Sequence, residues 1–253
     1  MSTARAELID FAEAPGLFME PAPGRFVRST DRYVLTGEVA HTWSAVERIR
    51  LGGDEIDDAI VEVAAFMREA DNVRAAWWVC ERSTPDDLEE RLLAAGCTID
   101  ESDYLNAAML LTREPPAVDG VEARRIETFE EFVESRQLQR RVFRGERVED
   151  FEAEWKLLPD PVYAAWIDGR MASVGRVVFT SVGGYLLSGA TAEWARGRGA
   201  YRAVVRARWD EAVRRGTPVL GVGAGAMSRP ILEHLGFEQV LQCRRIDSLR
   251  SER

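Results

Sequence analysis

Histidine and cysteine are scarce in this chain, which has two histidines and three cysteines among 253 residues. The histidines, His41 and His234, lie in no recognisable metal-site or catalytic-triad spacing. The cysteines, Cys80, Cys97 and Cys243, are far apart and form no C-x-x-C pair. We therefore expect no metal site, and we expect buried thiols in a reducing compartment.

Positive charge is also in short supply. The chain has 33 lysines and arginines against 43 acidic residues, a net charge of −10. A nucleic acid or an anionic membrane requires a basic face, so we expect neither as a partner. No apolar run is long enough to span a membrane. The first residues, with Glu7, Asp10 and Glu13, are too acidic for a signal peptide, so we expect a cytoplasmic protein.

What the chain does have is enough apolar residue, 46%, to bury a core. Its length allows one large domain or two of ordinary size. The segment from Thr112 to Gly120 contains Pro115-Pro116 and an Asp-Gly turn, and it continues neither a helix nor a central strand. We therefore predict a domain over residues 1–113, a linker over 114–120 and a second domain over 121–253.

The second half alternates strand and helix patterns around a predicted α/β layer with a mixed sheet. Thr128 and Glu131 form a capping box at a helix start, and Asp168-Gly169 predicts a hairpin turn. The predicted strands are residues 121–126, 162–167, 172–180, 185–191, 218–222 and 237–246. The predicted helices are residues 128–143, 148–157, 201–215 and 228–236.

The most informative stretch is Arg196-Gly197-Arg198-Gly199-Ala200-Tyr201, between a predicted strand and a predicted helix. A glycine turn at a helix start leaves backbone N–H groups unpaired. The helix dipole adds partial positive charge there, so the turn can hold a phosphate or pyrophosphate. An ordinary strand-to-helix connection would also accommodate these residues.

The stretch resembles the R/Q-x-x-G-x-G/A signature of the GCN5-related N-acetyltransferase (GNAT) superfamily. The order of elements after it, ending in Leu235-Gly236-Phe237, is similar to that family too. The last motif position departs, because Tyr201 stands where the family has glycine or alanine. The resemblance implies that acetyl-CoA is the cosubstrate. The residues it implies for CoA binding are Ala190, Thr191, Ala192, Arg196, Gly197, Arg198, Gly199, Ala200, Tyr201 and Ser228.

The resemblance also implies transfer of an acetyl group to an amine of a small molecule or a peptide. A backbone N–H of residues 189–192 is the expected oxyanion donor. Many GNAT enzymes protonate the thiolate with a tyrosine, but that position is Leu232 here. Ser228, Tyr185 or water is then the expected donor, and Glu193 is the acid nearest the loop. The alternative is a catalytically weak CoA-binding regulatory or scaffold protein. A homodimer is among the assemblies we consider.

The first half repeats the helix–strand–helix–Gly–strand order of residues 201–246. Gly52-Gly53-Asp54 stands ahead of its first helix in place of the loop, and Asp54 would repel a phosphate. We therefore predict two GNAT-like domains, each with a mixed, mostly antiparallel central sheet flanked by helices, and the first without a CoA loop. An unrelated α/β domain fits the periodicity equally well.

Residues 221–226 match a G-x-G-x-x-A dinucleotide fingerprint, which would indicate an enzyme of another class. A Rossmann unit needs this motif on its first strand with more sheet to follow. Only one short helix and one strand remain here. Close approach of the strand end to a backbone or ligand explains the small residues better.

Overall fold

The computed structural model describes residues 3–38, 44–70, 75–99, 105–143, 150–158 and 160–248. The chain forms two compact units. Unit 1 contains Met1–Leu110, Gly223–Glu233 and Glu238–Arg253, and unit 2 contains Leu111–Val222 and His234–Phe237. Among the described residues, no helix is long and apolar enough to cross a membrane.

Unit 1 is built on a sheet with the strand order β1-β2-β3-β4-β11-β5. Its strands are β1 (Arg25–Ser29), β2 (Val34–Glu38), β3 (Ser44–Glu47), β4 (Ala75–Cys80), β5 (Leu105–Leu111) and β11 (Glu238–Asp247). Its helices are α1 (Thr3–Glu13), η1 (Pro15–Phe18), α2 (Ile56–Glu69), α3 (Leu88–Ala94) and α7 (Arg229–His234). The β3–β4 pair is parallel, and the other pairs of this sheet are antiparallel.

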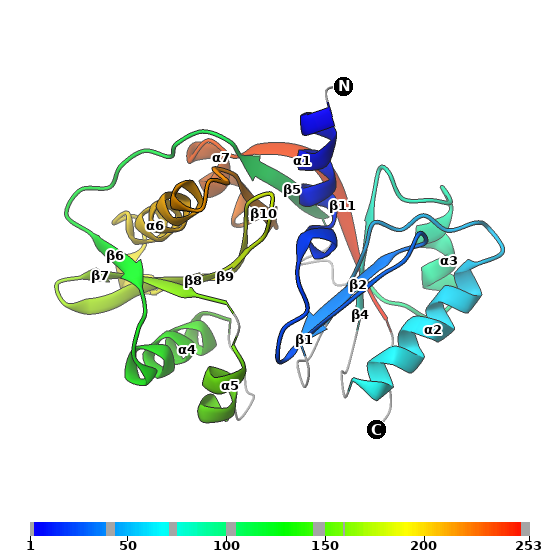
Figure 1. The fold of residues 1–253 in the computed structure, drawn as a ribbon, viewed down its shortest axis with the longest axis horizontal. Coiled ribbons are helices and arrows are strands. Elements are labelled where there is room, and N and C mark those ends of the chain that lie inside the picture. Colours follow the sequence, from blue (N-terminus) through cyan, green and yellow to red (C-terminus); the bar gives the residue numbers. More distant parts are fainter. Residues whose placement is uncertain are drawn as a thin grey trace. The chain divides into compact units, whose positions relative to one another are not determined.

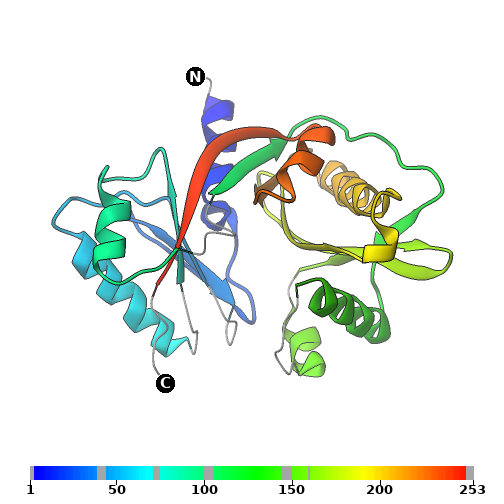
Figure 2. The ribbon, with the colours of Figure 1, turned by 180° about the vertical axis from the view of Figure 1, so that it is seen from behind.

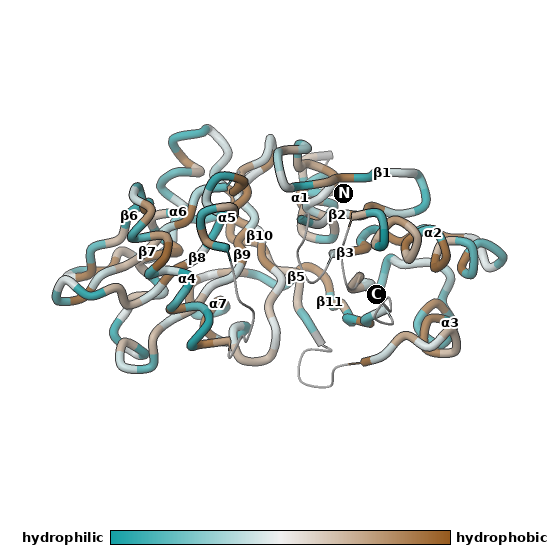
Figure 3. The backbone as a smooth tube through the Cα atoms, turned by 90° about the horizontal axis from the view of Figure 1, so that it is seen from below, coloured by the Kyte–Doolittle hydropathy of each residue, from teal (hydrophilic) through white to brown (hydrophobic). Residues whose placement is uncertain are grey.

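Helix α2 shows why the sequence pattern works. Its buried residues, Ile56, Ala59, Val63 and Met67, recur every three or four positions and pack on the sheet core around Trp77. The opposite face is charged, so the tube alternates brown and teal along this helix (Figure 3). This apolar stripe is the face by which α2 packs on the core of unit 1.

Unit 2 is built on the strand order β6-β7-β8-β9-β10. Its strands are β6 (Glu122–Arg125), β7 (Val162–Ile167), β8 (Arg170–Phe179), β9 (Gly184–Thr191) and β10 (Leu220–Ala224). Its helices are α4 (Phe129–Phe143), α5 (Phe151–Leu157), η2 (Glu193–Ala195) and α6 (Ala200–Arg214). Helix α6 covers one face of this sheet, and α4 and α5 cover the other (Figure 1). The β9–β10 pair is parallel and the other pairs are antiparallel.

Two local sequence motifs in unit 2, a capping box and a hairpin turn, adopt the structures that they predict. The N–H of Glu131 donates to Thr128 Oγ1 at 3.2 Å, as a capping box requires. Asp168 and Gly169 have φ values of 54° and 73°, the left-handed pair of a tight hairpin turn. The buried face of α6 departs from a purely apolar stripe: Val213 is 49% exposed, and Arg208 is only 1% exposed.

The same order of elements occurs twice along the chain. In unit 1 the series is α2–β4–α3–β5, and the matching series is α6–β10–α7–β11. In both, the strand before the first helix is parallel to the strand after it. The predicted fold class is confirmed: in each unit the strands pair in a mixed, mostly antiparallel order and are flanked by helices.

The C-terminal strand is where the structure departs from the predicted domain division. The sequence places residues 237–246 in the second domain, but β11 pairs with β4 and β5 in unit 1. Figure 2 shows it in red beside the green β5. A period-two pattern marks a strand and its buried face, but it does not identify the neighbouring strand.

Candidate active site

The loop between β9 and α6 has the backbone that its glycines predict. Gly197 and Gly199 have φ values of 74° and 84°, the left-handed region that favours glycine. Gly199 is the N-cap of α6, and no side chain caps the helix. The first hydrogen bond of α6 runs from Ala203 N to Gly199 O, at 3.0 Å. The N–H groups of residues 200–202 therefore precede the helical ladder and face an incoming acceptor.

Three arginines surround this turn. Arg196 is exposed and makes no ion pair with any residue in the described part of the chain. Arg198 pairs with the exposed Asp168 at 3.3 Å and lies over the Trp194 ring. The guanidinium of Arg202 lies beside Gly199, 3.4 Å from where a Cβ would stand. Sequence reasoning missed Arg202, although its place in the first turn of a helix that begins at an anion site is the signal that reveals it.

Strand β9 carries a bulge at its centre. Its register with β8 shifts between Val174 and Arg176, so Ser188 and Gly189 face the single residue Gly175. Ser188 has a φ of 52°, and its carbonyl accepts a hydrogen bond of 2.7 Å from Gln139 Nε2. The parallel register with β10 covers Gly184 to Leu186 only. The rest of β9 thus has no strand partner on that side within the described sheet.

Three residues predicted for CoA binding lie at the end of β9 or directly after it. Ala190 is buried in the core, and its carbonyl accepts from Ser173 Oγ at 2.9 Å. Thr191 Oγ1 lies 2.9 Å from the same hydroxyl. The N–H of Ala192 already donates to Ala172 O at 2.9 Å, which makes it a poor oxyanion donor. The N–H groups at the bulge are therefore the better candidates.

Tyr201 and Arg208 pack on the back of the bulge. The Tyr201 ring lies against Gly189, its Cε2 2.9 Å from where a Cβ would stand. Arg208 lies against Gly175 in the same way, with Nη1 at 2.7 Å. Because the Tyr201 side chain points to the sheet, its departure from the usual glycine or alanine leaves the loop's N–H groups uncovered.

Burial shapes the charges of this pair. Burial raises the pKa of Tyr201 more than the nearby Arg208 lowers it. The phenol is therefore neutral at physiological pH. Burial lowers the pKa of Arg208, whose Nε and Nη1 donate to Val204 O and Arg176 O at 3.1 Å each. Its Nη2 has no hydrogen-bond partner among the described residues. Neither residue was predicted to contribute its side chain to the acyl-binding strand.

The predicted catalytic residues lie in three different settings. Tyr185 is half-buried on β9 opposite Gly221 of β10, before the bulge. Glu193 is exposed at the start of η2 and holds no described partner through its side chain. Ser228 belongs to unit 1, where its Oγ donates to Gly225 O at 3.3 Å. Leu232 is fully buried in α7 and donates no proton.

A separate pocket of about 550 Å³ lies along β6 and α6 in unit 2. Its cations are largely neutralised within the unit: Arg206 pairs with Glu114 and Asp210, and Arg124 pairs with Glu131. The 196–199 loop does not line it. It therefore offers an anionic ligand less than the loop does. Among the described residues no cluster suits a metal ion, and His41 lies outside them.

Solved structures share this architecture across nearly the whole chain. A tandem GNAT protein from the clavulanic acid biosynthesis pathway matches with a TM-score of 0.59 and 14% identity, covering 99% of this chain and 95% of that one. The chain has the tandem GNAT fold. A GCN5-related N-acetyltransferase from Kribbella flavida matches with a TM-score of 0.60 and 14% identity, over 97% and 93% of the two chains.

A functionally unknown protein from Staphylococcus epidermidis has a TM-score of 0.64 and 8% identity, over 88% of this chain and 93% of its own. No protein-family model and no curated protein matches the sequence. At these identities the likeness concerns the fold, and the site has to be argued from its own residues.

Proposed function

We propose that unit 2 binds acetyl-CoA at the 196–201 loop and transfers its acetyl group to an amine. The observation that carries the proposal is the uncapped start of α6. Two left-handed glycines expose its first N–H groups, and three arginines stand around them. A pyrophosphate fits this chemistry, because it accepts several hydrogen bonds and needs cationic neighbours.

The bulge on β9 supports acyl transfer at the other end of the ligand. The neutral amine attacks the thioester carbonyl, a C–N bond forms, and the C–S bond then breaks. An N–H of the bulge stabilises the oxyanion between these steps. The departing thiolate takes a proton, for which Tyr185 of unit 2 remains our proposed donor. The acceptor is an amine of a small molecule or a peptide, which must lose its proton before it attacks.

The test is calorimetric titration with acetyl-CoA against two matched variants. Gly199→Asp places a carboxylate beside the pyrophosphate and should weaken binding at least tenfold, about 1.4 kcal/mol. Gly216→Asp is the control, since Gly216 has a similar φ of 77° at the other end of α6. It carries the same backbone strain and the same charge, and it should leave affinity within about twofold of the parent. Equal affinities for all three proteins would refute the loop as the binding site.

The second candidate is a CoA-binding regulatory or scaffold protein. It is favoured by Leu232, which is fully buried where many GNAT enzymes have the tyrosine that protonates the thiolate. Thiol release from acetyl-CoA with a panel of amines separates the two. Release that depends on the amine and rises with pH supports the transferase. Tight binding with no release across the panel supports the second candidate.

A further inference from the structure

We propose that Cys80 and Cys243 are an oxidation site, at which a peroxide joins them in an intramolecular disulfide between β4 and β11. This site lies in unit 1, and it does not depend on the function proposed for unit 2. All three cysteines of the chain are buried thiols in the structure.

The strand register brings the two thiols together. Cys243 and Cys80 are direct partners in the antiparallel β11–β4 pair. Direct partners project their side chains on the same face of a sheet. Both residues are buried but retain some exposed surface, 4% for Cys80 and 6% for Cys243. Cys97 packs in the core with residues of α2 and α3, and it is not part of the β4–β11 strand pairing.

The backbone of Cys80 identifies the kind of pair. Its N–H donates to Ser83 Oγ at 3.0 Å, and its carbonyl accepts from Ser83 N at 2.9 Å. Asp247 of β11 exchanges both backbone hydrogen bonds with Thr98 and not with its β4 partner Ala76. Because pairs alternate along an antiparallel ladder, Cys243, four residues before it, likewise exchanges no ladder hydrogen bonds with Cys80. Such a pair has the closer Cα spacing, about 4.5 Å, which lies within the range that a disulfide spans.

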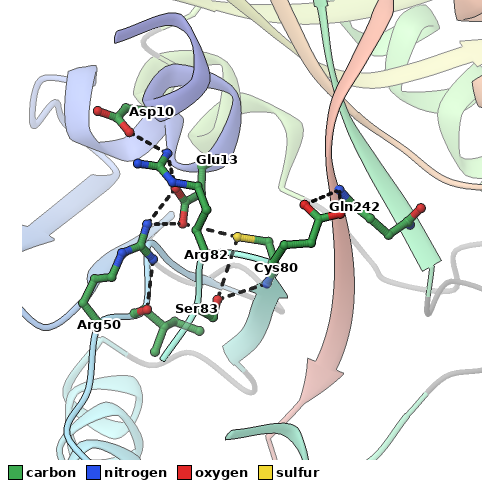
Figure 4. Close-up of polar contacts among 9 residues, drawn as sticks. Asp10, Glu13, Arg50, Cys80, Arg82, Ser83 and Gln242 are labelled. Atoms are coloured by element: carbon green, nitrogen blue, oxygen red, sulfur yellow. Dashed lines mark hydrogen bonds and ion pairs between the residues drawn. The ribbon is translucent and has the colours of Figure 1, made fainter. Parts of the chain in front are cut away.

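The surroundings prepare Cys80 to react first (Figure 4). Its thiol donates to Glu13 Oε1 at 3.3 Å, and Ser83 Oγ donates to its sulfur at 3.8 Å. Glu13 is held by Arg50 at 2.7 and 2.9 Å and by Arg82 at 2.8 Å. The Glu13 carboxylate thus accepts the hydrogen bond of the thiol, and the two guanidinium groups that hold it bring positive charge near the sulfur.

The two thiols differ in acidity. The hydrogen bond from Cys243 lowers the pKa of Cys80, although burial and Glu13 act against it. The same contact, together with burial, raises the pKa of Cys243. An acidic thiol beside a second, less acidic one is the arrangement in which the first attacks and the second resolves.

The reaction balances with one peroxide. The Cys80 thiolate attacks a peroxide oxygen, the O–O bond breaks, and the leaving hydroxide takes up a proton, which gives a sulfenic acid and water. The Cys243 sulfur then attacks the Cys80 sulfur, and the S–O bond breaks. The second hydroxide leaves with the Cys243 proton as water. Two thiols and one peroxide become one disulfide and two waters.

Peptide mapping of the full chain after hydrogen peroxide treatment tests this directly. Trypsin places the three cysteines on separate peptides, residues 75–82, 92–113 and 216–244. We expect the intact mass to fall by about 2 Da and a cross-linked species joining peptides 75–82 and 216–244. Dithiothreitol should reverse both changes. A cross-link through peptide 92–113, a covalent dimer, or over-oxidised thiols without any cross-link would overturn the proposal.

Variants sharpen the assignment. Cys97→Ser should keep the 2 Da loss, whereas Cys80→Ser and Cys243→Ser should each abolish it. Because these residues are buried, a serine variant can fail to fold, and the map of the unaltered chain then decides the matter alone. The oxidised parent should also melt at a higher temperature than the reduced one, since the cross-link closes a very long loop.

Discussion

At the scale of single residues, the most unusual group is the carboxyl of Glu47 in unit 1. It is buried, and it accepts a hydrogen bond of 3.4 Å from Gly16 N. Burial raises its pKa to about 8, the Gly16 N–H opposes this, and the nearby Glu13 charge adds to it. The folded state therefore holds this proton over a pH range in which the unfolded chain has lost it.

This shift predicts a pH dependence of stability. The contribution of Glu47 is fully present below about pH 4.5, its unfolded pKa, and is lost as pH rises through about 8. The loss is at most about 5 kcal/mol. Denaturant unfolding at several pH values measures it. Glu47→Gln keeps the size and an acceptor for Gly16 but cannot ionise, so its stability should decline less across this window. Parallel curves for parent and variant would show that Glu47 does not titrate there.

The buried Arg208 gives a second prediction at this scale. A Cβ at residue 175 would stand 2.7 Å from its Nη1, and Arg208 is 1% exposed with little room to move. Gly175→Ala should therefore destabilise the fold by about 1–3 kcal/mol. In an Arg208→Met background the clash is absent, so Gly175→Ala should destabilise the fold by at least about 1 kcal/mol less than it does in the parent. A double-mutant cycle by thermal or denaturant unfolding measures this coupling, and additive effects would rule out the contact.

At the scale of elements, the two strand-to-helix loops of the repeat have opposite chemistry. The loop before α6 exposes its N–H groups, but in the loop before α2 the N–H of Gly52 donates to the Glu55 carboxylate at 2.6 Å. The Glu55 carboxylate thus occupies a backbone N–H group that a phosphate would need.

This difference predicts one CoA site per chain. Calorimetric titration should give a stoichiometry near one, and Gly199→Asp should remove that site without revealing another. Glu55→Gln is the informative companion, because it removes the carboxylate charge at the first loop. It should not create a second site, since Asp54 still repels a phosphate. Two equivalent sites in the parent protein would contradict the prediction.

Local signals predicted elements well where nothing distant competed for the same atoms. Thr128 caps α4 as expected because its hydroxyl accepts from Glu131 N and bonds to no other residue in the part of the chain that the structure describes. Thr84 has the same cap chemistry, yet α3 begins at Leu88, because Thr84 bridges to Arg50 and its Oγ1 donates to Leu51 O. The loop at 196–201 was readable because glycine and arginine act there through local backbone geometry. The packing of Tyr201 and Arg208 on two glycines was not, because it depends on a bulge in another element.

At the scale of the whole molecule, the element repeat followed from periodicity, but the place of β11 did not. That strand lies between β4 and β5 within the sheet of unit 1. Its neighbours in space are therefore far from it in sequence, where no turn fixes the pairing.

The position of β11 predicts what truncation does. A chain that ends at Gly236 leaves β4 and β5 with unpaired edges in the middle of a sheet, and such edges aggregate. We expect loss of cooperative melting by circular dichroism and a shift to large species on size exclusion. A chain that ends at Ser248 is the control and should melt like the parent. A synthetic peptide of residues 237–248 should restore melting to the shorter chain, and normal melting without it would contradict the assigned pairing.

The position of β11 near the C-terminus also delays completion of the unit 1 sheet during synthesis. Strands β6 to β9 have all been made once residue 191 is added, whereas the sheet of unit 1 waits for residue 247. At about 5–20 residues per second, that wait after β5 lasts on the order of ten seconds or more. During this interval β4 and β5 of the nascent chain lack the strand that pairs with both of them. In this chain the half that emerges first is the half that matures last.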